Sequence, residues 1–346
     1  MRVVHLVESL GGGVLSSVLT MVDATPDIEH HLVTWPRRDH ADTGDERRPF
    51  HTTGALPRGP LAAARALRAE VGELAPDVLH AHSSYAGMLA RGGELDVDVI
   101  YSPHCFAFER RDIGAVHRAG IRHIERALVR RTAVLVACSP HEAVLARNLG
   151  HRRVVTVPNR ALNPPDVRAR FATPLRVVTA GRISSQKDWR HLLAAKRSFD
   201  DAGVRPAQWE WLGGGEPGAE AALREGGIAV SGWLSRDEVV RRLAAAQVYV
   251  HTAAWEGAPV SIIEAATVGL PIVARRIPTL ESLGVPGLAA SPEDLALRVA
   301  GLLDPGQWSA EQVSSLAFAA DHSASAQRRR LGTAYQHTPA AALILS

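Results

Sequence analysis

Two glutamates in the second half of the chain have the spacing of a ligand-binding pair. Seven small or apolar residues separate Glu256 from Glu264. The run Val248–His251 predicts a strand and Ser261–Val268 a helix, so Glu256 lies in the turn between them. Carboxylates accept hydrogen bonds from vicinal hydroxyls, and the N–H groups of a helix start bind oxygen-rich ligands. The segment suits a sugar or ribose site, but its spacing alone favours an acidic helix start with a solvated glutamate.

Two cations lie in a loop of the same half. The segment Gly181–Lys187 (GRISSQK) directly follows the predicted strand Leu175–Thr179, which places Arg182 and Lys187 at the carboxyl end of that strand. Two fixed cations there could clamp a diphosphate. Taken alone, the segment fits a pair of solvated surface charges equally well. Beside the two glutamates, the binding interpretation is favoured.

A histidine pair gives a weaker signal. His80 and His82 flank Ala81 at a predicted strand end, a spacing that a metal-dependent hydrolase could use. We find no further His or Asp at suitable strand ends to complete the set. The sequence therefore predicts no metal site.

The first glycine-rich segment departs from a dinucleotide-binding fingerprint. Gly11–Gly13 follows the first predicted strand, but Ser16 stands where the third glycine would be. The second strand ends in Thr34–Trp35, without an acidic residue for a ribose. A nicotinamide enzyme is not favoured, although Arg37–Arg38 could hold a 2′-phosphate.

Strands and helices alternate in the first half of the chain, which predicts a parallel α/β domain. The predicted strands are Val3–Val7, Leu32–Thr34, Val78–His80, Val97–Tyr101, Val134–Ala137 and Val154–Val157, and the predicted helices are Val14–Val22, Leu61–Leu74, Gly114–Arg131 and Pro140–Leu149. Pro36–Pro60, rich in charge, Gly and Pro, is expected to be a long loop.

Four prolines between Pro158 and Pro174 interrupt this pattern, and we interpret them as an interdomain linker. A second alternating series follows, with strands at Leu175–Thr179, Trp209–Leu212, Ile228–Val230, Val248–His251 and Pro271–Ala274 and helices between and after them. The prediction is an α/β protein with two doubly wound, Rossmann-like domains, residues 1–160 and 161–320, that face each other across a ligand cleft. Residues 321–346 form a tail that crosses back to the first domain or frays.

Length and composition suit this architecture. The 346 residues contain 39 Lys and Arg against 36 Asp and Glu, and this near balance gives no support for a nucleic-acid partner. No apolar run is long enough to span a bilayer, Glu8 interrupts the N-terminal apolar residues, and the two cysteines give no disulfide framework. We expect a cytoplasmic protein, and the frequent alanine and arginine point to a bacterial source.

The order of several motifs resembles one family. Gly181–Lys187, followed about seventy residues later by the glutamate pair, resembles the retaining family-4-type (GT4) glycosyltransferases of GT-B fold. Supporting segments are Leu10–Gly13, Ser102–His104, Ala137–Ser139, Val157–Asn159, Trp211–Gly215 and Gly232–Leu234. Each is a modest signal alone, but in this order they are specific and cover most of the chain.

The resemblance implies a role for each matching residue. Arg182 and Lys187 would bind the diphosphate and neutralise the leaving nucleotide, so neither a metal nor another cofactor is expected. Glu256 would approach the donor-sugar hydroxyls, Glu264 would hold the ribose, and His104 would hydrogen-bond the donor sugar near the reacting face. Further donor contacts would come from Gly12, Gly13, Gly232, Ala258, Val260 and Ser261. On the acceptor side the candidates are His82 and Ser83, which fit satisfied loop residues equally well.

The implied activity is transfer of a sugar from a nucleotide diphosphate sugar, with UDP favoured, to an acceptor hydroxyl with retention and without a metal. The alternatives are a GT-B epimerase or hydrolase of nucleotide sugars, and a catalytically silent nucleotide-sugar-binding partner protein. The sequence departs from the family at Asp188, where glycine is frequent, and at Arg160–Ala161, where glycine and an acidic residue are usual. Asp188 is expected to cap the following helix.

The segment from Glu109 to Arg131 is strongly basic, with seven arginines against three acidic residues, a net charge of +4. A basic amphipathic helix can lie on an anionic membrane surface. We favour instead a solvated helix face or a site for an acidic acceptor.

Overall fold

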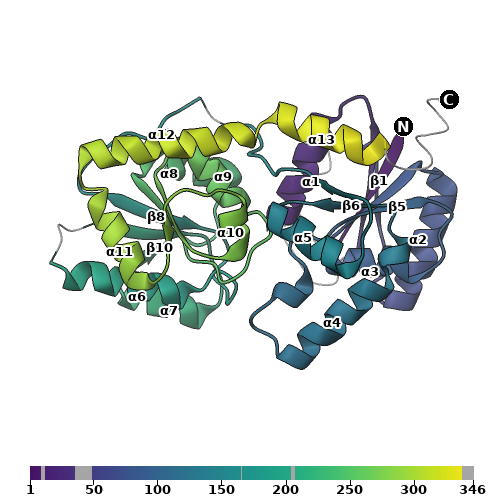
Figure 1. Cartoon of the computed structure of the whole chain (residues 1–346), viewed down its shortest axis with the longest axis horizontal. Helices are drawn as coiled ribbons and strands as arrows, with labels where there is room; N and C mark the ends of the chain where they lie inside the picture. Colours follow the sequence, from purple (N-terminus) through teal and green to yellow (C-terminus); the bar gives the residue numbers. More distant parts are fainter. Residues whose placement is uncertain (9–11, 36–48, 165, 204–206, 337–346) are drawn as a thin grey trace. The chain divides into compact units, whose positions relative to one another are not determined.

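The computed structural model describes residues 1–8, 12–35, 49–164, 166–203 and 207–336 (Figure 1). The chain divides into two compact units. The first unit consists of Met1–Leu162 and Ser323–Ser346, and the second of Asn163–His322. The passage from the first unit to the second thus falls inside the proline-rich segment, and the chain returns to the first unit at its C-terminal end.

A seven-stranded parallel sheet forms the first unit, in the order β3-β2-β1-β4-β5-β6-β7. The strands are β1 (Arg2–Val7), β2 (Glu29–Thr34), β3 (Thr52–Ala55), β4 (Val78–His82), β5 (Asp98–Ser102), β6 (Val134–Ala137) and β7 (Val154–Thr156). The order reverses between β1 and β4. Open α/β sheets bind ligands at such a switch point, outside the carboxyl ends of the strands.

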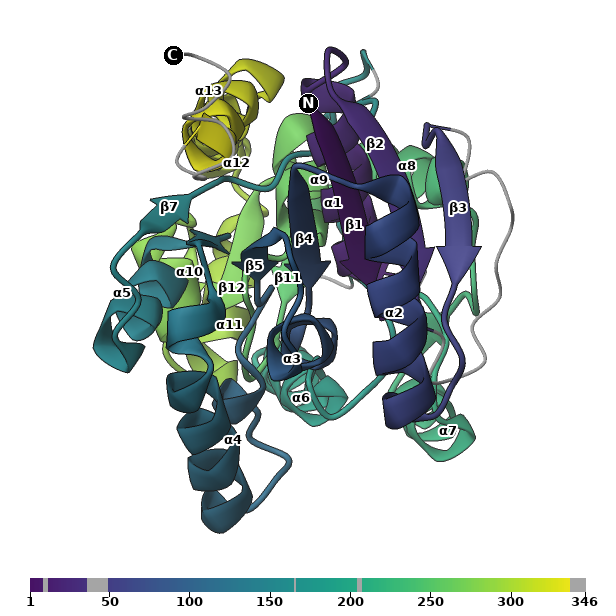
Figure 2. The same cartoon turned by 90° about the vertical axis from the view of Figure 1, so that its right-hand side faces the viewer.

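Helices cover both faces of this sheet (Figure 2). They are α1 (Gly12–Ala24), α2 (Pro60–Leu74), α3 (Ser84–Gly92), α4 (Ala115–Ala127), α5 (Pro140–Leu149) and α13 (Ala324–Gln336), with 3-10 turns η2 (Ala107–Glu109) and η3 (Val129–Arg131). The helices α2 and α3 pack on the face that carries Val4, and α1 and α13 on the face that carries Val3. Side chains alternate along a strand, so His5 of β1 and His80 and His82 of β4 point toward α1 and α13.

A six-stranded parallel sheet forms the second unit, in the order β10-β9-β8-β11-β12-β13. Its strands are β8 (Arg176–Ala180), β9 (Gln208–Leu212), β10 (Ile228–Val230), β11 (Val248–His251), β12 (Ile272–Arg275) and β13 (Leu288–Ala289). Its helices are α6 (Trp189–Asp201), α7 (Pro217–Glu225), α8 (Arg236–Ala245), α9 (Val260–Thr267), α10 (Pro278–Ser282), α11 (Pro292–Gly301) and α12 (Pro305–Asp321). The strand order reverses between β8 and β11, which makes their carboxyl ends the switch point of this unit.

The expected long loop Pro36–Pro60 is wrong in its second part, because β3 lies within it. This edge strand has the sequence TTGA and is largely exposed, so it lacks the apolar alternation that predicts a strand. Residues 36–48 of the expected loop lie outside the described residues. The sequence analysis also missed the elements α3, α10, β13 and α13, of which α10 and β13 are too short to give a periodic pattern.

Candidate active site

The loops that follow β8 and β11 meet at the switch point of the second sheet. The hydroxyl of Thr252 donates a hydrogen bond to the carbonyl oxygen of Lys187 at 2.7 Å. The hydroxyl of Thr279 donates to the carbonyl oxygen of Glu256 at 2.8 Å. Neighbouring elements thereby fix the backbone of both charged residues.

Lys187 and Glu256 form an ion pair at this point. The Lys187 Nζ lies 2.6 Å from Oε1 of Glu256, and the two side chains are 18% and 8% exposed. His251, the last residue of β11, places its Nε2 3.4 Å from the same oxygen. Burial alone would raise the pKa of Glu256, but the Lys187 ammonium and His251 lower it to about 2. Glu256 is therefore ionised at neutral pH, and Lys187 retains further N–H donors for a ligand.

Glycines allow the loop after β8 to press against the end of β9. Gly213 has φ +142°, and a Cβ there would lie 2.3 Å from the carbonyl oxygen of Gly181. A Cβ on Gly215 would lie 2.2 Å from the carbonyl oxygen of Ile183. Real Cβ atoms do not approach oxygen this closely, so a side chain at either position would displace the loop that carries Arg182 and Lys187.

Arg182 is exposed at this edge of the unit. Its guanidinium lies 5.9 Å from the ring centroid of Trp233, which is itself 69% exposed. Trp233 follows Gly232, which has φ +73° and pairs with Gly213 in an isolated antiparallel bridge. The site thus offers a cation and an open aromatic face together, a combination suited to a phosphate and to ring stacking.

The helix α9 starts where the sequence predicts. Its N-cap is Pro259, so Glu256 precedes the helix and Glu264 lies within it, as expected. Ser261 in the first turn accepts a hydrogen bond from the Tyr249 hydroxyl at 2.8 Å. The first N–H groups of a helix have no carbonyl one turn earlier, so this turn can donate to an oxygen-rich ligand. Ala258 and Val260 are buried on either side of the N-cap.

Glu264 is paired with a residue that the sequence analysis missed. Arg236, at the start of α8, donates through Nη2 to Oε1 of Glu264 at 2.8 Å. Burial raises the pKa of Glu264, and Arg236 opposes that rise. Arg236 gives no sequence signal because it reaches Glu264 from another helix. The only signal for His251, also missed, is its polar character at the end of a buried strand.

Asp188 caps α6, as predicted. Its Oδ1 accepts a hydrogen bond from the backbone N–H of His191 at 3.3 Å. Its other carboxylate oxygen lies 2.7 Å from Nη1 of Arg275. The residue has φ +47°, which explains why glycine suits this position in the family that the sequence resembles.

Strained backbone marks the switch point of the first sheet. Ser83, His104 and Cys105 follow the ends of β4 and β5 and have φ values of +80°, +52° and +99°. Such conformations cost about 1–3 kcal/mol each and cluster at functional sites. The hydroxyl of Ser83 donates to Oε2 of Glu8 at 3.1 Å, which brings the end of β1 to the same place. The sequence analysis did not assign Glu8 to a site.

A buried carboxylate holds the turn that carries His104. Oε1 of Glu142 accepts from the N–H of Cys105 at 2.7 Å, and Oε2 accepts from the N–H of Cys138 at 2.8 Å. Glu142 lies in the first turn of α5, and its own N–H donates to the N-cap Ser139 at 3.2 Å. The Ser-x-x-Glu spacing is the signal that could have revealed this clamp.

The glycines predicted to contact the donor open α1. Gly12 has φ +66° and Gly13 follows it inside the helix. The other part of the expected glycine loop, residues 10 and 11, lies outside the described residues.

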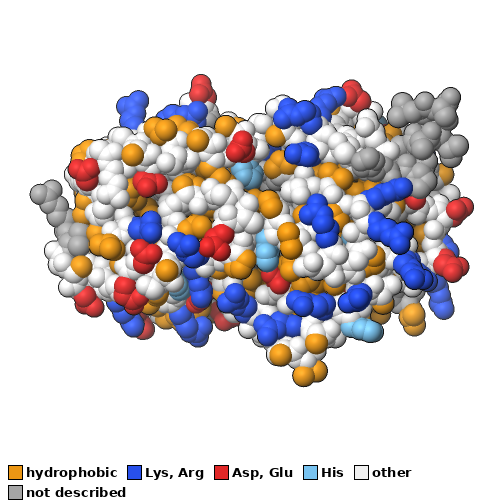
Figure 3. All heavy atoms as spheres, in the orientation of Figure 1, with side chains coloured by type: hydrophobic (Ala, Val, Ile, Leu, Met, Phe, Trp, Pro, Cys, Tyr) orange, Lys and Arg blue, Asp and Glu red, His pale blue; other side chains and the backbone are white. Residues whose placement is uncertain are grey.

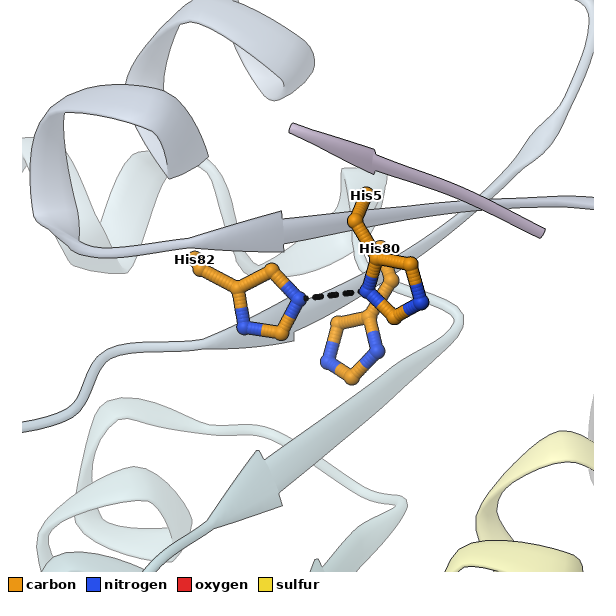
Figure 4. A group of neighbouring side chains, drawn as sticks. All are labelled: His5, His80 and His82. Carbon is orange, nitrogen blue, oxygen red and sulfur yellow. Dashed lines mark hydrogen bonds between the residues drawn. The ribbon is translucent and has the colours of Figure 1, made fainter. Parts of the chain in front are cut away.

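The predicted absence of a third metal ligand beside His80 and His82 is wrong. His5 of β1 joins them, and one ring nitrogen from each of the three lies within 4.8 Å of the others (Figure 4). These distances alone would admit a metal ion. Hydrogen bonds, however, already use the nitrogens: His5 Nδ1 lies 3.0 Å from His82 Nε2, and His80 lies 2.8 Å from the Ser102 hydroxyl and 3.3 Å from that of Tyr335.

His5 and His82 are the middle of a longer chain of histidines. The Nε2 of His5 lies 3.0 Å from Nδ1 of His30, and Nδ1 of His82 lies 3.0 Å from Nε2 of His104. Burial lowers the pKa of all four, to about 4 for His104. These four histidines are therefore neutral at pH 7. His82, a predicted acceptor-side residue, is fully buried, whereas its hydrogen-bond partner His104 is half-buried.

The basic segment forms α4, which buries little. Its Glu125 is buried and accepts from Arg91 at 2.8 Å and from the Tyr101 hydroxyl at 2.9 Å. The outer side carries exposed arginines together with Val116, which is 88% exposed. Figure 3 shows Lys and Arg side chains gathered where this helix lies in Figure 1.

Among the helices of the described ranges, none is long and apolar enough to cross a membrane.

Two family models match the chain. Residues 3–160 match the model described as a glycosyl transferase 4-like domain, and residues 174–304 match the model of glycosyl transferases group 1. A protein from the cps region of Klebsiella pneumoniae, described as uncharacterized, is 23% identical over 88% of this chain and 89% of its own length. The 2-deoxystreptamine glucosyltransferase of Streptomyces kanamyceticus is 30% identical over 50% of this chain, which spans about half (51%) of that relative.

Solved structures share the fold. Sucrose-phosphate synthase from Thermosynechococcus elongatus superposes with a TM-score of 0.78 at 16% identity and covers the whole of both chains. HepE from Anabaena, solved in complex with UDP-glucose, gives 0.77 at 17% identity over 96% of this chain and 99% of its own. The two parallel sheets, the matched models and these structures agree, and the chain belongs to the GT4-type glycosyltransferases of GT-B fold.

Proposed function

We propose that this glycosyltransferase moves a sugar from a UDP-sugar to an acceptor hydroxyl, with retention of anomeric configuration and without a metal ion. The observation that carries the proposal is the Lys187–Glu256 pair at the β8/β11 switch point, with the exposed Arg182 on the same loop as Lys187. UDP is favoured because HepE, a structural neighbour, was solved with UDP-glucose.

The charges suit a departing diphosphate. Lys187 and Arg182 supply two cations from one short loop, and the helix start at Val260 and Ser261 supplies N–H donors. Stabilising charge that develops on a leaving group is usually among the largest catalytic contributions. These groups can do the neutralising work that a divalent cation does in other transferases, which is our reason to propose metal independence.

The carboxylates suit the sugar and the ribose. Glu256 stays ionised, so its oxygens can accept from donor-sugar hydroxyls. Glu264 would accept from the ribose, with Arg236 holding its side chain in place. The open face of Trp233 beside Gly232 would lie near the nucleotide base. In the first unit, the family resemblance assigns donor contacts to Gly12, Gly13 and His104 and an acceptor contact to Ser83.

The first experiment is a thermal-shift screen of the purified protein with UDP, GDP, ADP, dTDP, NAD and NADP, each with magnesium and with EDTA. A ligand that binds the native state raises the melting temperature by mass action. We expect UDP to give the largest shift, equal with magnesium and with EDTA. A shift only with NAD or NADP would overturn the proposal, and a shift that needs magnesium would overturn metal independence.

The second experiment tests transfer. UDP release from UDP-glucose is followed with and without a panel of hydroxyl acceptors that includes 2-deoxystreptamine, because a 30% identical relative is a 2-deoxystreptamine glucosyltransferase. Acceptor-dependent release and an α-linked product by NMR would support retaining transfer. Release without acceptor would favour a hydrolase, and binding without release would favour a silent nucleotide-sugar-binding protein.

A further inference from the structure

The histidine chain of the first unit ends on a group whose hydrogen-bonding role is fixed. Nε2 of His30 lies 3.1 Å from the carbonyl oxygen of Thr25, and a carbonyl oxygen can only accept. The Thr25 hydroxyl also lies 3.0 Å from this nitrogen, but it donates to the carbonyl oxygen of Met21 at 2.8 Å. Both Thr25 oxygens therefore act as acceptors toward His30, and the proton of His30 belongs on Nε2.

This assignment passes from ring to ring, because a neutral imidazole has one N–H and one lone pair. With its proton on Nε2, His30 presents a lone pair at Nδ1, so Nε2 of His5 must donate to it. The same step makes Nε2 of His82 the donor to His5, and Nε2 of His104 the donor to His82.

We propose that the Thr25 carbonyl sets a single proton arrangement for the four linked histidines, with the proton on Nε2 of each ring. His104 then offers an unprotonated Nδ1 as the hydrogen-bond acceptor for a hydroxyl of the sugar substrate. His30, His5 and His82 are positioning residues that act through His104. The sugar as ligand rests on the proposed function, whereas the proton arrangement does not.

The competing arrangements each leave a buried mismatch. Reversing all four rings would set the lone pair of His30 against the Thr25 carbonyl oxygen at 3.1 Å. A Thr25 hydroxyl that turned to donate to His30 would give up its hydrogen bond to the carbonyl oxygen of Met21. Reversing only some of the rings would leave two lone pairs or two N–H groups facing each other at 3.0 Å. His5 and His82 are fully buried, so water cannot relieve the mismatch, and an unsatisfied buried polar group destabilises the folded state.

The arrangement decides what His104 can bind. Within the described part of the chain, the ring hydrogen bond of His104 goes through Nε2, and the ring is half-buried at the strained end of β5. Its Nδ1 can then accept from a hydroxyl but cannot donate to a carbonyl or a phosphate. At this position the site would select a hydrogen-bond donor, such as a hydroxyl, over a carbonyl or phosphate oxygen.

The test is the protonation state of each ring in the full-length protein. Long-range 1H–15N correlation spectra of 15N-histidine-labelled protein at pH 7 distinguish Nε2–H from Nδ1–H, and single His→Gln variants assign the signals. We expect Nε2–H at His5, His30, His82 and His104. A proton on Nδ1 of His82 or His104 would overturn the proposal. A metal ion between His5, His80 and His82 would give this contrary signature at His82.

Two variants of His30 test the positioning role. In His30→Gln, the amide can still donate to Thr25 and its oxygen can accept from His5, so the spectrum of His104 and the donor KM should stay as in the wild type. His30→Phe removes both bonds and should give a mixed His104 state and a donor KM raised about threefold to tenfold, the value of one hydrogen bond. His123→Phe, on the exposed side of α4, is the control that should change neither.

The outcomes separate the two proposals. If no sugar is transferred but all four rings carry Nε2–H, the proposed function fails and the proton arrangement stands. If His30→Phe does not fold, the wild-type spectrum still decides. Equal KM values for folded His30→Phe and the wild type would overturn the link from the chain to the substrate.

Discussion

At the scale of single residues, Lys187 and Glu256 form an ion pair whose side chains are only 18% and 8% exposed. Removing one member of a buried pair leaves the other charge uncompensated, so substitution tests both activity and stability. Two further side chains contact the carboxylate: His251 Nε2 lies 3.4 Å from Oε1, and Gln186 Nε2 donates to Oε2 at 3.4 Å.

We expect Lys187→Ala to lower kcat/KM for transfer by at least about 100-fold, the usual effect of removing one group that stabilises transition-state charge. Lys196→Ala is the matched control, because Lys196 is the other lysine of the sequence and pairs with Asp200 along α6. Steady-state kinetics with saturating acceptor would measure both. Turnover by Lys187→Ala close to that of Lys196→Ala would remove Lys187 from the catalytic site.

Glu256 should also make stability depend on pH. Its pKa is about 2 in the folded protein against 4.5 in the unfolded chain, so its contribution is complete above pH 4.5 and is lost as the pH falls from 4.5 toward 2. The full contribution is about 3 kcal/mol. Urea unfolding of the wild type and of Glu256→Gln at pH 6 and at more acidic pH should show the difference between them shrinking as the pH falls. A difference that stays constant would contradict the depressed pKa.

At the scale of elements, the switch points position the charged residues, and the glycines at the end of β9 allow the loop after β8 to close on the sheet. The contact of Gly213 with Gly181 combines a positive φ with a Cβ-to-oxygen distance that no side chain can adopt. The position of Arg182 and Lys187 therefore depends on the absence of a side chain at Gly213.

We expect Gly213→Ala to destabilise the protein by more than about 2 kcal/mol and to weaken UDP binding, because both the backbone strain and the displaced loop contribute. Gly218→Ala is the control: Gly218 lies in α7 with open space around its Cα, so alanine should be neutral or stabilising by up to about 1 kcal/mol. Chemical denaturation and UDP titration of both variants measure the two effects. Equal stability would show that the loop tolerates a Cβ at Gly213.

The sequence predicts those elements that depend on local pattern. Buried parallel strands such as β11 are continuous apolar runs, and the helix after Glu256 follows from its periodicity, so the carboxylate pair and the cation loop were placed on the right elements. Neither β3 nor α13 was predicted, because an exposed TTGA strand and a polar helix carry little apolar signal. The histidine chain joins residues of β1, β2, β4 and the loop after β5, and only tertiary structure shows such a contact.

At the scale of the whole molecule, the two units differ in how the chain builds them. The second unit is one continuous segment, whereas the first needs the C-terminal residues to complete its core. From α13, Leu331 and Tyr335 pack against Val3 and Met21, and the Tyr335 hydroxyl meets His80. The charged residues that we propose to bind the donor, Arg182, Lys187, Glu256 and Glu264, all belong to the second unit.

Leu331→Ala should therefore destabilise the first unit while the second unit, with Lys187 and Glu256, keeps its stability. Leu331 is fully buried, and a Leu→Ala change in a core costs about 2–5 kcal/mol. Hydrogen exchange read by mass spectrometry should show faster exchange in peptides from β1 and β4 and unchanged exchange in peptides from β8 and β11. Leu297→Ala, at a position 72% exposed on α11, should change neither. Faster exchange in β8 and β11 of the Leu331 variant would mean that the two units unfold as one cooperative body.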